Sequence, residues 1–81
     1  MTTIRVRLFA HMAQQAGIHD FKLSIPAGTT VAQNRPLVEQ KFPTVRWPQT
    51  IMLAVNQQYV PPDHPLHEND EVAIIPPVSG G

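Results

Sequence analysis

The chain has 81 residues, with six basic and six acidic side chains and no cysteine. This length predicts a single domain, 1–81, with a modest core, and the balanced charge makes nucleic acid and anionic membranes unexpected partners. The absence of cysteine excludes a cysteine nucleophile, a cysteine-held metal and a disulfide. The N-terminus lacks the apolar core of a signal peptide, so we expect a soluble cytoplasmic protein.

The first part of the chain predicts two strands separated by a short helix. Residues 4–8 alternate between apolar and polar side chains, which is the period of a strand with one buried face. Residues 10–16 are rich in helix formers, and Gly17 follows them as a candidate C-cap. Residues 19–25 alternate again until Pro26 ends the segment. Two strands joined in this way predict a local antiparallel or splayed pair.

A second helix is predicted to begin at Thr30, its N-cap, and to run to about Phe42. Its core-facing side also carries Asn34 and Arg35, which is a poor pattern for a core. Pro36 falls in the interior of this helix, where proline costs about 3 kcal/mol. The alternative is a helix that begins near Pro36, because proline is tolerated in a first turn. We therefore expect a kinked or shortened helix.

The second half of the chain predicts the remaining strands. The apolar segment 51–55 is typical of a buried strand, and Trp47 before it is expected to pack on the core or its loop. The other elements, in chain order, are a turn at 56–58, a short pairing segment at 59–60, turns at 63–66 and 67–70, and a last strand at 71–75. This order predicts an α+β fold. The simplest arrangement is a ubiquitin-like β-grasp, in which one main helix packs across a mixed sheet and the first and last strands are adjacent and parallel.

Residues 76–81 form a predicted projecting tail. Pro76 and Pro77 cannot donate to a sheet, so the last strand ends before them, and the proline pair favours a stiff, extended path. Fully extended, the tail would reach roughly 20 Å. Gly80 and Gly81 have no side chain, so the terminal carboxylate sits on a tip thin enough for a narrow channel. The alternative is an ordinary frayed chain end.

The body of the chain offers no catalytic constellation. Ser24 and Ser79 have no base placed by a motif, and the acidic residues are scattered. His64 and His67 are three residues apart in a turn bounded by prolines, whereas zinc takes three or four protein ligands, so no metal site is predicted. We expect no catalytic site built from this chain's own side chains.

Three apolar residues are predicted to form a docking surface beside the tail. Phe9, Tyr59 and Ile75 each fall on the face opposite a core-directed set or at the end of a strand. If the first and last strands are neighbours, Phe9 and Ile75 share one exposed sheet face, and Tyr59 extends it. An apolar patch beside a projecting tail is typical of a surface that guides the tail into a partner. The alternative is a set of scattered surface apolar residues, which are common.

Four motifs, spread over nearly the whole chain, occur together. They are Val6-Arg7-Leu8-Phe9-Ala10, Ala54-Val55-Asn56-Gln57, Asp63-His64-Pro65-Leu66, and the closing run of Asp70-Glu71-Val72-Ala73-Ile74-Ile75 and Pro76-Pro77-Val78-Ser79-Gly80-Gly81. Together they resemble the MoaD/ThiS sulfur-carrier family, and within it the MoaD type, the small subunits of molybdopterin synthase. The glycine pair alone would be a weak sign, because ubiquitin shares it, but the combination is specific.

The resemblance implies a ubiquitin-like β-grasp and a chemistry centred on the Gly81 carboxylate. An E1-like activating enzyme would adenylate this carboxylate with ATP, and sulfur would then convert it into a thiocarboxylate. The tail would enter the large subunit of molybdopterin synthase and donate its sulfur to cyclic pyranopterin monophosphate. Gly80 would allow this insertion. The chain itself would hold no cofactor stably and would serve as the sulfur-donor subunit of a sulfurtransferase.

The resemblance also implies a partner surface. In the family the synthase is a heterotetramer, with two small subunits at the ends of a large-subunit dimer. The positions that match the family's apolar docking surface are Phe9, Tyr59 and Ile75, and we also expect the tail residues Pro76, Pro77 and Val78 to bind the partner. Two departures matter. The main helix carries Asn34 and Arg35 where the family is usually apolar, and Pro36 is unusual inside it. Ile74-Ile75 stands where the family often has aromatics, so the docking surface is expected to be shallower.

Other functions stay open on the sequence. A thiamine-type or other sulfur carrier would share the tail and its activation, although the Pro76-Pro77 pair and the 63–66 turn argue against it. A ubiquitin-like modifier would instead join Gly81 to a lysine of a target protein. A plain interaction module would need no free C-terminus, so blocking the terminus separates it from the others.

Overall fold

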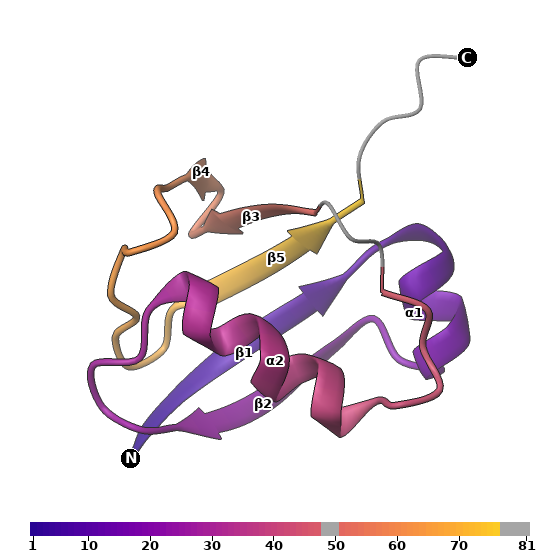
Figure 1. Cartoon of the computed structure of the whole chain (residues 1–81), viewed down its shortest axis with the longest axis horizontal. Coiled ribbons are helices and arrows are strands. Elements are labelled where there is room, and N and C mark those ends of the chain that lie inside the picture. The colour runs from indigo at the N-terminus through magenta and orange to yellow at the C-terminus, as the bar shows by residue number, and fades with distance from the viewer. Residues whose placement is uncertain (48–50, 77–81) are drawn as a thin grey trace.

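The first and last strands lie side by side at the centre of a five-stranded mixed sheet (Figure 1). A computed structural model describes residues 1–47 and 51–76 of the chain. The elements are β1 (Thr2–Leu8), α1 (Ala10–Ala16), β2 (Asp20–Ile25), α2 (Val31–Lys41), β3 (Met52–Val55), β4 (Gln58–Tyr59) and β5 (Glu71–Ile75). The strand order is β2-β1-β5-β3-β4, with β1 and β5 parallel and the other pairs antiparallel. This is the β-grasp arrangement predicted from the sequence.

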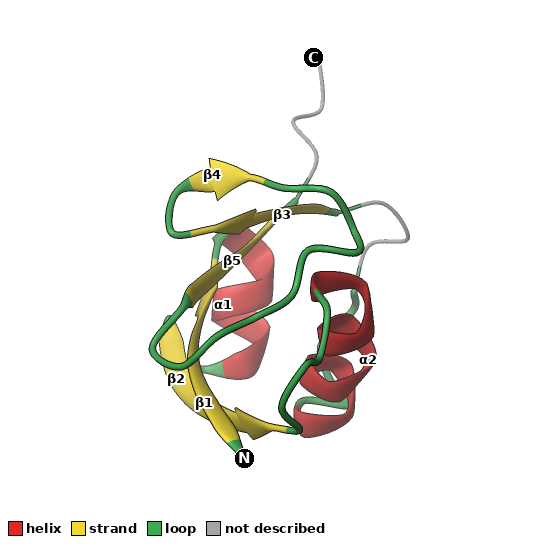
Figure 2. Cartoon of the chain, turned by 90° about the vertical axis from the view of Figure 1, so that its left-hand side faces the viewer, coloured by secondary structure: helices red, strands yellow, loops and turns green. Residues whose placement is uncertain are grey.

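Both helices lie on one side of the sheet (Figure 2). The alternation of β1 places Ile4, Val6 and Leu8 toward this side, where each is at most 3% exposed. Helix α1 contributes Met12 to the same core, and β5 contributes Val72. Gly17 ends α1 in the left-handed conformation, with φ of 76°, as its position in the sequence predicts. Among the described residues neither helix is long and apolar enough to cross a membrane.

Helix α2 begins at Val31 and continues through Pro36 to Lys41, so the alternative start near Pro36 and the predicted shortening are both wrong. The reason is a well-satisfied N-terminus. The Thr30 side chain accepts a hydrogen bond from the Gln33 amide at 3.3 Å, and the Gln33 side chain accepts one from the Thr30 amide at 3.0 Å, forming a capping box.

The amides of the first helical turn also donate to carbonyls of the 61–66 loop, as Val31 does to His64 at 3.0 Å. A bend at Pro36 stays a prediction.

The core-facing side of α2 carries the predicted polar residues. Asn34 is only 1% exposed, and its side-chain carbonyl oxygen has no hydrogen-bond partner among the described residues. Arg35 is half-buried and pairs with Glu39 at 2.6 Å along the helix. Trp47 packs against the core and donates a hydrogen bond to the Phe42 carbonyl at 3.3 Å, which confirms its predicted packing role.

Strand β3 differs in part from its predicted burial. Ala54 and Val55 are buried, but Met52 is 41% exposed, so the segment is not a uniformly buried strand. The strand lies inside the sheet and is covered by helices on one side only, so every second residue faces away from the core. Asn56 and Gln57, with φ of 50° and 70°, then form the two-residue turn into β4, a geometry that matches the twist of a hairpin.

Candidate docking surface and carboxyl-terminal tail

The pairing registers assemble one row of side chains on the face of the sheet that the helices leave open. Arg7 of β1 is the partner of Ala73 in β5, Ala73 is the partner of Ala54 in β3, and Ala54 is the partner of Tyr59 in β4. Direct partners on neighbouring strands point to the same face. Four segments that are far apart in the sequence therefore meet on this open face.

A second row of side chains lies two residues further along β5, nearer the tail. Ile75, the last residue of β5, is the direct partner of Met52, the first residue of β3. Tyr59 is 65% exposed and Met52 is 41% exposed, whereas Ile75 is half-buried. Together with Phe9 these residues form what we call the docking surface: Phe9, Met52, Tyr59 and Ile75. The surface spans the width of four adjacent strands. Because neighbouring strands lie about 4.8 Å apart, this width is about 14 Å.

Phe9 reaches this surface from the junction between β1 and α1. Strand β1 ends at Leu8, so Phe9 is the N-cap residue of α1 and not the sheet residue that the alternation predicts. The Arg7 guanidinium lies 5.8 Å from the centre of its ring, which places the ring beside the open face. The next residue, Ala10, has a φ of 53°, a left-handed conformation that is unfavourable for alanine. Phe9 itself keeps an extended backbone, with φ of −130° and ψ of 158°, and is 37% exposed, and the sharp turn at Ala10 takes the chain from there into α1.

The sequence analysis named three of the four residues of this surface, Phe9, Tyr59 and Ile75, and did not name Met52; that the surface binds a partner stays a prediction. The apolar run at 51–55 hid the alternation of the strand, because both of its faces carry apolar side chains. The available signal was the two-residue spacing between Met52 and Ala54, which puts both on one face of a strand.

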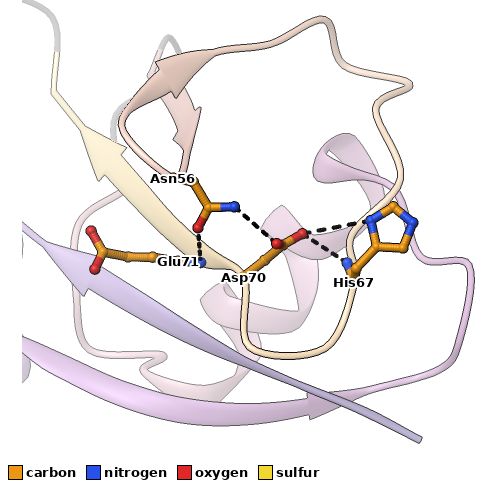
Figure 3. Close-up of polar contacts among 4 residues, drawn as sticks. All are labelled: Asn56, His67, Asp70 and Glu71. Atoms are coloured by element: carbon orange, nitrogen blue, oxygen red, sulfur yellow. Dashed lines mark hydrogen bonds and ion pairs between the residues drawn. The ribbon is translucent and has the colours of Figure 1, made fainter.

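A polar network anchors the start of β5 to the β3–β4 turn (Figure 3). The Asn56 side chain donates to the Asp70 carboxylate at 2.9 Å and accepts from the Glu71 amide at 3.0 Å. The His67 amide donates to the other Asp70 oxygen at 2.8 Å, and the His67 imidazole lies 3.9 Å from it. The Asn56 amide also donates to the Glu71 carbonyl at 2.8 Å. The loop before β5 is thus held at the point where the strand begins.

An ion pair joins the open-face side chains of β1 and β5. The Arg7 guanidinium lies 3.5 Å from a Glu71 carboxylate oxygen. The Arg7 side chain is 46% exposed, so this pair is largely solvated and contributes little stability. It does separate the docking surface from the more polar part of the open face around Arg5.

The histidines predicted to be turn residues do not form part of a metal site among the described residues. His64 is half-buried, and its backbone carbonyl accepts from Val31. His67 belongs to the Asp70 network. No group of three or more histidine, aspartate or glutamate side chains in the described part of the chain is arranged to hold a metal ion.

The tail begins where the sequence predicts. Strand β5 ends at Ile75, and Pro76 is half-buried directly after it. The predicted partner-binding residues Pro77 and Val78, and the predicted reactive tip of Gly80 and Gly81, lie outside the described residues. Their roles stay predictions. The position of Ile75 beside Met52 nevertheless fixes the exit of the tail next to the docking surface.

Known proteins resemble the chain over nearly its whole length. Residues 6–81 match the ThiS family. A molybdopterin synthase sulfur carrier subunit from Arabidopsis thaliana is 35% identical over 79 residues, which cover 96% of this chain and 82% of that protein.

Two solved structures share the fold. The small archaeal modifier protein 1 of H. volcanii has a TM-score of 0.85 at 20% identity and covers 96% of this chain and 100% of its own. A chain in the complex of subunits 1 and 2 of molybdopterin-converting factor from Helicobacter pylori 26695 has a TM-score of 0.71 at 21% identity, covering 99% of this chain and 100% of its own.

Proposed function

The chain belongs to the ThiS family, and from this membership we propose that it is the sulfur-carrier small subunit of molybdopterin synthase, acting in molybdenum cofactor biosynthesis. The observation that carries the proposal is the 35% identity to a molybdopterin synthase sulfur carrier subunit over 96% of the chain. The sequence ends in the glycine pair that this chemistry requires. A cytoplasmic setting is part of the proposal, because a chain without cysteine needs no oxidising compartment to fold.

The proposed chemistry takes place at the carboxylate of Gly81. A carboxylate is a poor electrophile, so an E1-like enzyme first joins one of its oxygens to the α-phosphate of ATP and releases pyrophosphate. A sulfur donor then attacks the acyl carbon and AMP departs, which leaves a thiocarboxylate. The thiocarboxylate sulfur is a nucleophile that builds the dithiolene from cyclic pyranopterin monophosphate. No side chain of this protein takes part, and no cofactor stays bound to it.

The described residues include an exposed apolar surface that supports the docking this chemistry needs. The proposed partner is the large subunit of molybdopterin synthase, in a heterotetramer of two small and two large subunits. The docking surface of Phe9, Met52, Tyr59 and Ile75 would seat on it, since exposed apolar patches mark protein interfaces. Because β5 leads directly from this surface into Pro76, a partner seated there lies at the base of the tail.

Removal of Gly81 tests the proposal. The intact protein, incubated with ATP, a sulfur donor and the activating enzyme, should gain about 16 Da as sulfur replaces one oxygen of its terminal carboxylate. The Gly81-deleted protein should fold equally well and yet form no molybdopterin with the large subunit. Gly80→Val should slow transfer by obstructing entry of the tip, whereas Ser79→Ala, which keeps the tail length and both glycines, serves as the matched control.

Each other function has a distinct outcome in the same experiment. Molybdopterin formation by the Gly81-deleted protein would show that the terminal carboxylate is not the sulfur carrier. A thiocarboxylate that supplies only a thiazole-forming enzyme would identify a thiamine-type carrier. Covalent attachment of Gly81 to lysines of other proteins, without sulfur transfer, would identify a modifier.

A further inference from the structure

A pocket of about 490 Å³ lies on the polar half of the open face, toward the start of β1 and β5. Its lining includes Arg5, Lys22, Asn56, Glu68, Asn69 and Glu71. Arg5 and Glu71 are register partners on β1 and β5, so the pocket occupies the same face as the docking surface. Ile75 lies four residue steps along β5 from Glu71, which corresponds to about 13 Å along the strand.

The two carboxylates of the pocket already have partners within the chain. Glu68 accepts a hydrogen bond from the Thr3 amide at 2.8 Å. Glu71 pairs with Arg7 at 3.5 Å, on the side of the docking surface. Their negative charges are thus partly compensated inside the fold.

The two cations of the pocket have no such partner. Arg5 and Lys22 are direct register partners in the antiparallel pairing of β1 and β2, and both are exposed. Neither side chain forms an ion pair or a hydrogen bond with any residue in the described part of the chain. Like charges directly opposite each other destabilise a sheet. An anion placed between Arg5 and Lys22 would remove this repulsion.

We propose that this pocket is the polar continuation of the docking surface and receives a carboxylate side chain of the molybdopterin synthase large subunit between Arg5 and Lys22. The inference rests on the proposed function. The pocket adjoins the docking surface, because Arg7 contacts Phe9 of the docking surface on one side and Glu71 of the pocket on the other. This continuity supports the inference. A stable interface covers about 800 Å² on each partner, so beside the inserted tail and the four apolar side chains it has room for the adjoining polar part of the open face.

The charges of the pocket favour a carboxylate over a phosphate. Glu68 and Glu71 line the same space as the two cations, and they would repel a doubly charged anion more strongly than a single carboxylate. The chain as a whole has no net charge, which also disfavours a polyanion such as a nucleic acid. An acidic side chain on a protein partner fits the local charges and the neighbouring apolar surface together.

The test measures binding of the intact protein to the large subunit encoded in the same genome, at low and high salt. The double variant Arg5→Gln/Lys22→Gln should bind about tenfold more weakly at low salt, and the difference should shrink at high salt as ions screen the contact. The control is Lys41→Gln/Arg46→Gln, which changes the net charge equally. Lys41 ends α2, and the Arg46 amide donates to the Gln15 side chain of α1 at 2.6 Å, so both residues belong to the helical layer and not to the open face. The control should bind like the unaltered protein, and denaturant unfolding should show that both double variants are folded.

Several outcomes would overturn the inference. Equal affinity of the Arg5/Lys22 variant and the unaltered protein would show that the pocket is not part of the interface. An equal loss in the control variant would indicate a general effect of net charge. Chemical shifts of Arg5 and Lys22 that respond to inorganic phosphate, with no change in large-subunit affinity, would assign the pocket to a phosphate. A changed oligomeric state in sedimentation would assign it to a second copy of this chain.

The same experiment separates this inference from the proposed function. If the unaltered protein binds the large subunit and transfers sulfur while the variant binds equally well, only the pocket assignment fails. If the unaltered protein does not bind the large subunit at all, both are overturned.

Discussion

Met52 and Ile75 are direct partners across the antiparallel pairing of β3 and β5, at the point where β5 passes into the tail. Residues 23 positions apart in the sequence therefore share the open face of the sheet. This pairing makes Met52 a member of the docking surface and puts that surface at the base of the tail.

A charge introduced into this pair should weaken docking. Ile75→Lys and Met52→Lys would each bury an unpaired ammonium in the interface, and binding to the large subunit should weaken by about 2–4 kcal/mol. The fold should survive, because both side chains already reach solvent. Titration calorimetry would measure the affinity.

Ile18→Lys is the matched control for these variants. Ile18 is 38% exposed and lies in the connection between α1 and β2, outside the rows of the docking surface. It should bind normally. Unchanged affinity of both Met52→Lys and Ile75→Lys would contradict the docking surface.

Loss of the Asn56–Asp70 contact should destabilise the fold. The Asp70 side chain is 14% exposed, and its removal leaves the His67 amide and the Asn56 side chain without their acceptor. Asp70→Ala should therefore cost about 1–3 kcal/mol in the free energy of unfolding. Denaturant unfolding measures this energy.

A double-mutant cycle with Asn56→Ala isolates the contact between the two side chains. The double variant should lose less stability than the sum of the single variants, by about 0.5–3 kcal/mol, because the residues are hydrogen-bonded at 2.9 Å. The control Gln58→Ala, at an exposed position of β4, should change stability by about 0.5 kcal/mol or less. Strict additivity of Asn56→Ala and Asp70→Ala would mean that the contact carries no coupling.

Pro36→Ala should stabilise the protein. The helix continues through this position, so alanine restores an amide that can donate to the Ala32 carbonyl. Proline also restricts the unfolded chain, which offsets about 1 kcal/mol of the roughly 3 kcal/mol penalty of an interior proline. The expected gain in the free energy of unfolding is about 2 kcal/mol. An unchanged stability would contradict the interior position of Pro36, and Gln40→Ala in the same helix provides the comparison.

Asn34→Leu should also stabilise the protein. The Asn34 side-chain carbonyl oxygen is buried without a partner in the described part of the chain, and an unsatisfied buried polar group costs about 1–3 kcal/mol. Leucine has the same branching and number of side-chain heavy atoms as asparagine and no polar atom, so thermal or denaturant unfolding should show a gain within that range, reduced by the larger volume of its methyl groups. Asn34→Ala should gain less, because it leaves a cavity. A loss of stability in Asn34→Leu would contradict the prediction.

The local features of the fold followed from the sequence because they depend on neighbouring residues. The period of two in β1, the Thr30 cap, the glycine after α1 and the proline that stops β5 all act within a few positions. The order of strands and helices then left the β-grasp as the simplest arrangement. The predicted reactive group, the carboxylate of Gly81, also follows from the sequence alone.

Only the tertiary structure decided which face of each strand the helices cover and which residues from distant segments lie together. A strand pattern defines two faces, but it does not say which one the helices cover when both are apolar, and Met52 was misjudged for that reason. The persistence of α2 through Pro36 depends on loop carbonyls about thirty positions away, which cap its first turn. The pairing of Asn56 with Asp70, and the placing of Arg5 and Lys22 beside the docking surface, likewise arise from contacts that form only when distant strands align.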